Sequence, residues 1–302
     1  MKIKKIKIHE PTVFCSTWQS IWKLDQQWFD QFDVVICDEC HKAKAKCITD
    51  IMTKLKDCPN KFGFTGTLDG TQTHKMILTG LFGPVRQNVS TKELQDQNYL
   101  SELKIKAIIL KHPQKACKEL SSATYHEEAD WICGSKKRNN FIKNLALSLK
   151  GNTLILYQFI EKHGDILNEL ISKESKKPVF YIHGEVKGTE REDIRQFVNN
   201  NKEADIIASM GCFAEGINIP GINNIIFAFP SKSRIKVLQM IGRGLRKSDG
   251  KEECVLFDLV DNLKWKNRKN YALKHFEERF KLYIEEDFPV KQYDIELKEE
   301  HL

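Results

Sequence analysis

Short apolar runs alternate along the chain with longer stretches in which apolar residues recur every three or four positions. In the second half, this spacing predicts helices over 136–150, 164–173, 189–199 and 233–243. Apolar runs predict strands over 153–157, 179–182, 205–208, 224–228 and 254–259. Alternating strands and helices form parallel sheets covered by helices, so this half predicts a complete doubly wound α/β unit.

The first part of the chain has fewer strand candidates. Apolar runs at 12–15, 34–37 and 61–64 end in polar residues, and a turn-rich stretch follows. We therefore expect an incomplete α/β domain within 1–95, a connector over 96–134 and a complete domain over 135–263. Residues 264–302 begin with aromatic residues at helical spacing among basic residues, which predicts a C-terminal helical extension.

Composition excludes several classes of protein. Of 302 residues, 41% are hydrophobic and 29% charged, which is a globular rather than a disordered balance. No apolar stretch approaches the ~20 residues of a membrane helix, so we expect no membrane partner. The N-terminus alternates Lys and Ile and lacks the apolar core of a signal peptide, so we do not expect secretion. Without secretion, the nine cysteines indicate reduced thiols rather than disulfides, and we expect a cytoplasmic protein. A net charge of +7 slightly favours a polyanionic partner.

The segment Val-Val-Ile-Cys-Asp-Glu-Cys-His at 34–41 is the first candidate site. It runs from a buried strand directly into Asp38, Glu39 and His41. Ligands bind beyond the carboxyl ends of parallel strands, where a carboxylate can hold Mg²⁺ and its neighbour can orient or deprotonate a water. A surface turn after a strand is the alternative interpretation.

Two more segments supply complementary chemistry. Thr65 begins Thr-Gly-Thr, which follows the 61–64 run and can bond both the acidic segment and a ligand. Arg243 and Arg246 stand three apart near the end of a predicted helix, a spacing that puts both guanidinium groups on one face. Guanidinium suits the charge that develops on a transferring phosphoryl group, although a basic helix end also complements the helix dipole.

In this order and spacing, the segments resemble the motifs of superfamily 2 helicases. The Asp-Glu-x-His box, Thr-Gly-Thr, a Ser…Glu-Gly-Ile-Asn-Ile-Pro segment at 209–220 and Gln-x-x-Gly-Arg-x-x-Arg at 239–246 match its motifs II, III, V and VI. The resemblance covers most of 12–260 and is nearest to the phage recombination helicases of the UvsW type. It implies an α/β fold of two RecA-like parallel-sheet domains, the first truncated at its N-terminus, and an ATP-dependent DNA helicase that uses ATP and Mg²⁺.

The resemblance also implies roles for individual residues. Asp38 would hold Mg²⁺, Glu39 would position or deprotonate the attacking water and contact Mg²⁺ through water, and Arg243 and Arg246 would be the arginine fingers. His41 and Gln239 would couple the nucleotide site to movement between the domains. The remaining residues line the nucleotide pocket (Gly216 and Asn218, where the family usually has an acidic residue) or the nucleic-acid track (Thr17, Thr65, Gly184 and Ser209).

One family element is missing from the sequence. Such enzymes cradle phosphates in a Gly-x-x-x-x-Gly-Lys-[Ser/Thr] loop, and the only Gly-Lys pair here, Gly250-Lys251, is followed by Glu252 and lacks the leading glycine. We therefore expect an N-terminally incomplete chain or half of a split gene, whose partners are DNA and a polypeptide that carries the loop. Alone, the chain is expected to bind nucleotide weakly and to hydrolyse little ATP.

Competing interpretations remain. A non-catalytic nucleic-acid-binding remnant would also keep these motifs. Cys37-x-x-Cys40 could be half of a zinc or redox site, but no second such pair follows. A metal-dependent hydrolase could use Asp38, Glu39 and His41 directly, but it leaves the two arginines unexplained. The basic C-terminal helix could bind nucleic acid, although such helices more often pack their aromatic residues and solvate their charges.

Overall fold

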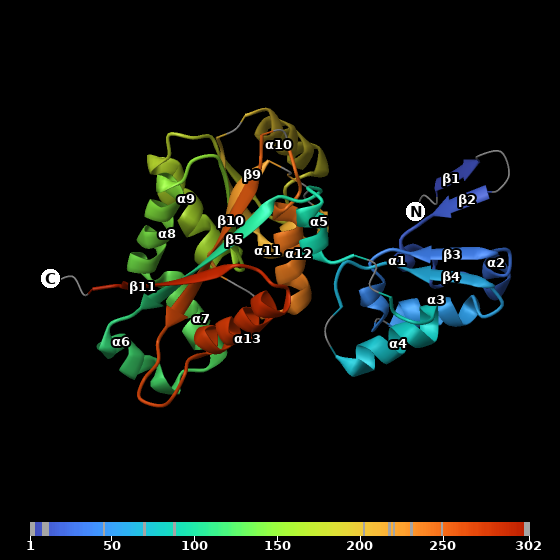
Figure 1. Ribbon diagram of the computed structural model, residues 1–302, viewed down its shortest axis with the longest axis horizontal. Coiled ribbons are helices and arrows are strands. Elements are labelled where there is room, and N and C mark those ends of the chain that lie inside the picture. The colour runs from blue at the N-terminus through green and yellow to red at the C-terminus, as the bar shows by residue number, and fades with distance from the viewer. Residues whose placement is uncertain are drawn as a thin grey trace. The chain divides into compact units, whose positions relative to one another are not determined.

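The computed structural model describes residues 4–7, 12–44, 46–68, 71–86, 89–201, 203–216, 219, 221–229, 232–248 and 250–298. The chain divides into two compact units, Met1–Asn88 and Val89–Leu302. Within the described ranges no helix is both long and apolar enough to cross a membrane. Each unit is built around its own parallel sheet (Figure 1), so the expected α/β fold class is confirmed.

The first unit has a small parallel sheet of two strands. Strand β3 (Val34–Cys37) pairs in parallel with β4 (Asn60–Gly63), close to where the apolar runs predicted strands. A separate antiparallel hairpin joins β1 (Lys4–Lys7) and β2 (Thr12–Cys15). The helical elements of this unit are α1 (Trp18–Ile21), α2 (Gln26–Phe29), the 3₁₀ turn η1 (Cys40–Lys44), α3 (Lys46–Lys54) and α4 (Gln72–Phe82).

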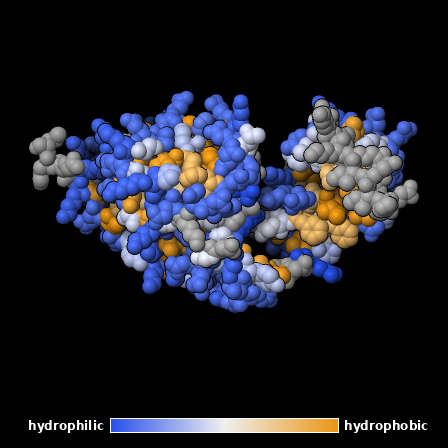
Figure 2. All heavy atoms as spheres, turned by 90° about the horizontal axis from the view of Figure 1, so that it is seen from above, coloured by the Kyte–Doolittle hydropathy of each residue, from blue (hydrophilic) through white to orange (hydrophobic). Residues whose placement is uncertain are grey.

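In the described part of the first unit, only one face of the β3–β4 sheet is covered. Val35 and Cys37 face a core built from helical residues such as Phe29, Ile51 and Leu78. The opposite face is apolar and open; its residues, with their exposed fractions, are Val34 50%, Ile36 68%, Phe62 49% and Phe64 55%. Figure 2 looks onto these strands and shows hydrophobic residues gathered at the surface of this unit. Parallel sheets are normally buried on both faces, so this apolar face calls for an explanation.

The second unit contains a sheet of seven parallel strands. Their order is β11-β5-β10-β9-β6-β8-β7. The strands are β5 (Glu102–Lys111), β6 (Asn152–Tyr157), β7 (Val179–Ile182), β8 (Asp205–Ser209), β9 (Ile222–Phe227), β10 (Glu253–Asn262) and β11 (Val290–Glu296). All five strands predicted for the second half are present. Because the strands are parallel, their carboxyl ends lie along one edge of the sheet and their amino ends along the other.

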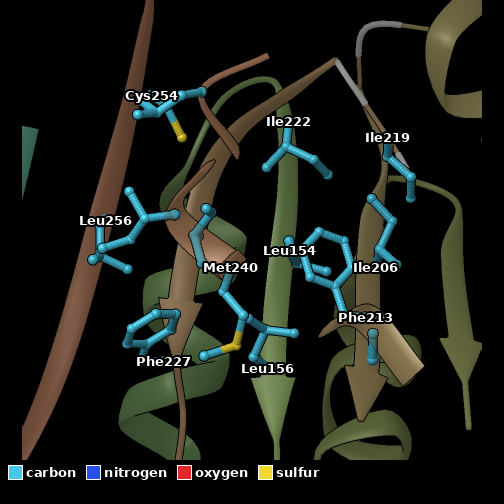
Figure 3. Close-up of a cluster of buried hydrophobic side chains, with 14 of the residues drawn as sticks. Leu154, Leu156, Ile206, Phe213, Ile219, Ile222, Phe227, Met240, Cys254 and Leu256 are labelled. Carbon is cyan, nitrogen blue, oxygen red and sulfur yellow. The ribbon is translucent and has the colours of Figure 1, made fainter. Parts of the chain in front are cut away.

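Helices cover both faces of this sheet, as the alternation predicted. The face with α8 (Lys136–Ser148) and α9 (Asp165–Glu174) buries Ile142 and Leu167. The other face carries α10 (Gly188–Asn200), α11 (Met210–Gly216), α12 (Arg234–Gly244) and α13 (Tyr271–Glu285). Figure 3 shows Met240 and Phe213, from α12 and α11, packed over Leu154 and Leu156 of the interior strand β6. This packing fixes where each helix begins and ends relative to the two edges of the sheet.

The segment expected to act as a connector contributes to the second unit. It contains the ten-residue strand β5, which pairs with β10 and β11 inside the sheet. The remaining elements before β6 are α5 (Thr91–Asp96), α6 (Gln114–Glu119), the 3₁₀ turn η2 (Leu120–Ser122) and α7 (Tyr125–Gly134). A π-helical turn, η3 (Ile160–Gly164), leads into α9.

The C-terminal segment forms the expected helix and one strand that the pattern did not predict. In α13, Phe276 and Tyr283 are buried, as the packing interpretation required. Arg279 was expected to be solvated, but it is buried and its guanidinium donates to both oxygens of Asp258 at 2.8 and 2.9 Å. Strand β11 follows α13 and completes the sheet beside β5.

Candidate functional site

The acidic segment and the Thr-Gly-Thr segment meet at the carboxyl edge of the small sheet. Directly after the strands, the Phe64 N–H donates to the Cys37 carbonyl at 2.8 Å, and the Cys40 N–H donates to the Phe64 carbonyl at 3.0 Å. These two bonds continue the β3–β4 pairing into the turns. The structure thus joins the two segments, far apart in sequence, through their backbones.

His41 connects these two segments through its side chain. Its Nδ1 lies 2.9 Å from Thr65 Oγ1 and 2.9 Å from Glu39 Oε2. The Thr65 hydroxyl donates its proton to the Thr67 carbonyl at 3.1 Å, so its oxygen is free to accept a hydrogen bond from His41. A proton on His41 Nδ1 can then be donated to both the Thr65 hydroxyl oxygen and the Glu39 carboxylate. Burial lowers the pKa of His41 more than the Glu39 carboxylate raises it. The imidazole is therefore neutral near pH 7, and its contact with Glu39 is a hydrogen bond rather than an ion pair.

Asp38 and Glu39 present their carboxylates at this edge. Asp38 is exposed, and one of its oxygens accepts the Glu39 N–H at 2.8 Å. Glu39 has a φ of 51°, a left-handed conformation unusual for a residue other than glycine, asparagine or aspartate. Oxygen ligands of this kind suit Mg²⁺, which keeps several waters and takes only one or two protein carboxylates when it accompanies a nucleotide. The residues present therefore fit the expected Mg²⁺ ion. The exposed Asp38 carboxylate is accessible to bind it, and His41 holds the Glu39 carboxylate beside it.

Two residues that support this turn escaped the sequence analysis. His74, on α4, is buried, and its Nε2 bonds the His41 carbonyl at 2.9 Å. Gly63 ends β4, where an added Cβ would lie 2.9 Å from Phe82 Cγ and 3.0 Å from Cys40 Sγ. Neither residue type signals such a role in sequence, since a lone histidine on a helix or a glycine at a strand end has many uses.

In the second unit, Ser209 and Gly184 lie at the carboxyl edge of the large sheet. Ser209 is the last residue of β8, and Gly184 follows the neighbouring strand β7. Ser209 is mostly buried, and its Oγ accepts the Cys212 N–H at 3.4 Å at the start of α11. Arg191 donates from Nη2 to the carbonyls of His183 and Gly184, both at 3.1 Å. This edge therefore offers small residues and a loop that is fixed by a guanidinium group.

The two arginines lie at the opposite, amino edge of the same sheet. Helix α12 ends at Gly244, and Arg246 forms an isolated bridge with Leu100, two residues before β5 begins. The expectation that both arginines share one helix face is wrong, because the helix ends between them and only Arg243 is helical. Gln239 lies one turn before Arg243 on α12, and both side chains are half-buried.

The other residues of the predicted nucleotide pocket are placed only in part. Helix α11 starts at the carboxyl edge and ends at Gly216, six residues before β9 begins. Asn218 lies outside the described residues. In the first unit, Thr17 precedes α1 and its hydroxyl lies 2.8 Å from Ser20 Oγ. The structure thus assigns the predicted nucleotide and nucleic-acid residues of the second unit to different edges of its sheet.

Two protein families match the chain. Residues 2–70 match the family of the type III restriction enzyme res subunit, and residues 136–248 match the helicase conserved C-terminal domain. These two matches coincide with the parts of the chain that carry the acidic segment and the two arginines.

The chain is also similar to individual helicases. It is 36% identical over 300 residues to the ATP-dependent DNA helicase uvsW of Enterobacteria phage T4, a match that covers 95% of this chain and 59% of that protein. The crystal structure of T4 UvsW superimposes with a TM-score of 0.58 at 33% identity, covering 93% of this chain and 57% of that one. A putative HsdR subunit of a type I restriction enzyme from Vibrio vulnificus shares the fold, with a TM-score of 0.66 at 16% identity, covering 93% of this chain and 52% of that one.

These comparisons confirm the resemblance that the motifs indicated. The similarity extends over both units, and the solved relatives have the same α/β architecture. The chain spans 59% of the length of the T4 helicase that it matches.

Proposed function

We propose, from the place of this chain among the superfamily 2 helicases, that it is the motor part of an ATP-driven translocase that remodels duplex or branched DNA. The observation that carries the proposal is the pairing of Asp38 and Glu39 with Thr65 at one sheet edge, through His41. In this arrangement a carboxylate that can bind a metal ion and a second that can act on water are joined to a hydroxyl-rich strand end. The T4 relative is described as an ATP-dependent DNA helicase, which supports ATP and DNA as the substrates.

The residues divide into two proposed tasks. Asp38 would hold Mg²⁺ and Glu39 would orient the attacking water, while Arg243 and Arg246 would stabilise charge on the transferring phosphoryl group. Mg²⁺, when bound, would neutralise negative charge on the phosphate oxygens. His41 is neutral near pH 7 and would hold Glu39 toward the water through its Nδ1–H.

Nucleic acid would meet a second set of residues, of which Thr65 also borders the acidic segment. Gly184 and Ser209, at the carboxyl edge of the large sheet, and Thr17 and Thr65, in the first unit, would contact the phosphate backbone through hydroxyls and backbone N–H groups. In the second unit this places nucleotide and nucleic acid at opposite edges of the sheet. Helices α11 and α12 pack side by side over that sheet and would transmit movement between the two edges.

The phosphate-binding loop is proposed to come from another polypeptide segment, which docks on the open apolar face of β3 and β4. The sequence contains no Gly-x-x-x-x-Gly-Lys-[Ser/Thr]. The four apolar side chains on that face are each about half exposed or more. Covering them would contribute about 4 kcal/mol, since full burial of such a side chain is worth about 1.5–3 kcal/mol. Among the residues that the structure describes, β3 and β4 pair with each other alone, so an occupant with apolar side chains and a free strand edge fits both the face and the outer edges of the two strands.

Binding of a fluorescent ATP analogue with Mg²⁺ tests the nucleotide assignment. We expect Asp38→Asn to reduce the Mg²⁺ dependence of binding and Arg243→Ala to weaken binding about tenfold. The matched controls are Glu192→Gln and Arg195→Ala, a pair on α10 of an exposed carboxylate and a partly exposed guanidinium, whose Nε donates to the Glu192 carboxylate at 2.8 Å. If Arg243→Ala binds like Arg195→Ala, the arginine is no part of a nucleotide site. Fluorescent duplex and forked DNA, measured in the same way, test the proposed substrate.

Co-expression with a polypeptide that is encoded beside this chain and carries the phosphate loop tests the docking proposal. We expect a complex with DNA-stimulated ATP hydrolysis, which Ile36→Lys disrupts. Ile284→Lys is the control, because Ile284 is similarly exposed at 60% but lies on α13. If the chain binds DNA but hydrolyses no ATP, and if no such polypeptide restores hydrolysis, the chain is instead a non-catalytic nucleic-acid-binding protein.

A further inference from the structure

Lys251, in the Gly-Lys pair that lacks the rest of a phosphate loop, is buried in the protein. The residue is only 5% exposed. Its Nζ donates to the Gly244 carbonyl and, at 3.0 Å, to the Arg246 carbonyl. The ammonium group therefore points at the backbone that carries the two arginines. In this orientation it contacts carbonyl oxygens of the chain rather than a ligand phosphate.

The contacts at the end of α12 explain why a lysine is buried here, although burial of an ammonium group is energetically unfavourable. A helix leaves its last carbonyl groups without intrahelical partners, and a cation near that end also complements the helix dipole. Gly244 is the last residue of α12, so Lys251 satisfies the end of this helix and the turn that follows it. Burial lowers the pKa of Lys251, because removing the ammonium group from water disfavours its charged form, and the two carbonyl oxygens offset part of this penalty.

The same turn is held from its other sides. The Ser101 N–H donates to the Leu245 carbonyl at 2.9 Å, and Arg246 forms a bridge with Leu100. At Gly244 an added Cβ would lie 2.3 Å from Ile225 Cδ1, so the end of α12 packs closely on β9. The helix ends between the two arginines, and beyond it the Arg246 N–H donates to the Arg243 carbonyl at 3.4 Å, which is long for a backbone hydrogen bond, so helical geometry alone does not fix Arg246 relative to Arg243. The contacts of the turn must do so.

We infer that Lys251 is a positioning residue that fixes Arg246 relative to Arg243 by binding the backbone carbonyls on both sides of Leu245. The inference rests on the proposed function, in which the two guanidinium groups meet the phosphates of one nucleotide. Lys251 itself touches no phosphate. A substitution of Lys251 keeps both arginines but removes the contacts that hold the turn between them, so the distance between the two guanidinium groups is no longer fixed.

Lys251→Met in the full chain tests this role, with Lys177→Met as the matched control. Lys177 also caps a helix end: its Nζ donates to the carbonyls of Leu149 at 2.6 Å and Gly151 at 3.1 Å, just after α8. It further contacts Asp205 at 3.4 Å, so its loss should destabilise the unit at least as much. Two quantities are measured for each variant: amide hydrogen exchange across 245–252, and affinity for the fluorescent ATP analogue with Mg²⁺.

We expect Lys251→Met to speed exchange across 245–252 at least tenfold and to weaken nucleotide binding about tenfold, while Lys177→Met does neither. Adding Arg246→Ala to Lys251→Met should cause little further loss, because the arginine is already misplaced. Lys251→Arg, which keeps a cationic donor, should restore part of the affinity.

Three results would overturn the inference. Unchanged exchange across 245–252 in Lys251→Met would show that other contacts fix the turn. Equal losses in Lys251→Met and Lys177→Met would show a general structural effect. Faster exchange with unchanged nucleotide affinity, while Arg243→Ala still weakens binding, would reject the positioning role and leave the proposed function intact. If neither Arg243→Ala nor Arg246→Ala affects binding, the proposed function itself fails.

Discussion

Arg138→Met removes the cation from a buried network at the carboxyl edge of the large sheet. The guanidinium is fully buried on α8, and its Nε donates to both carboxylate oxygens of Asp261, at 2.8 and 2.9 Å. Its Nη2 donates to the Ala228 carbonyl just after β9, and His112 lies 2.9 Å from Asp261 Oδ1. One side chain thus joins the ends of β10 and β9 to a helix, close to the edge proposed to meet DNA.

The size of the effect follows from Asp261. Burial alone raises the pKa of this carboxyl group, but the Arg138 guanidinium and the hydrogen bond from His112 lower it to about 2 from its ordinary 3.8. The lowered pKa contributes about 2.5 kcal/mol of stability, present above pH 4 and lost as the pH falls toward 2. Without Arg138 the carboxylate is left buried with less compensation, which costs about 3–5 kcal/mol. For a unit of this size, that lowers the unfolding temperature by about 10 °C.

Thermal unfolding followed by circular dichroism at pH 7 and pH 4 checks this. In Arg138→Met the pKa of Asp261 rises, so the deficit should be largest at pH 7 and smaller at pH 4. Adding Asp261→Asn should recover part of the loss. Lys143→Met is the control on the same helix, since its pair with the half-exposed Glu174 should be worth less than about 1 kcal/mol. A variant as stable as the wild type, or a deficit independent of pH, would refute the reasoning.

Three further predictions use other parts of the molecule. Gly63→Ala forces a Cβ against Phe82 and should destabilise the first unit by about 1–3 kcal/mol in urea unfolding; an unchanged midpoint would contradict the packing. Burial lowers the pKa of His163 to about 3 from 6.5, so between pH 6.5 and 5 the wild type should lose about 2 kcal/mol of stability that His163→Leu does not lose. Exposed Cys15 should react quickly with a thiol reagent in the folded protein, whereas Cys133, whose pKa burial raises to about 12, should react only on unfolding.

The sequence predicted the second unit well because its signals are local and repeated. Each strand from β6 to β10 is an apolar run, and helical periodicity separates the runs. Strand β11 went unpredicted because an edge strand needs few apolar residues; Val290 and Ile295 are its main contacts with the sheet. The acidic segment was also readable from sequence, since a strand that ends in two carboxylates and a histidine is a compact pattern.

Chemistry and element types were thus determined by the sequence, because side-chain identity and periodicity are properties of neighbouring positions. Relations between distant positions were decided by the tertiary structure alone. Packing ended α12 between Arg243 and Arg246, and it turned Lys251 toward the carbonyls at that end. The parallel sheet separated Ser209 from the arginines, and it brought His41 to Thr65 across twenty-four positions of the chain. Such relations depend on which surfaces bury one another, and local periodicity does not encode that.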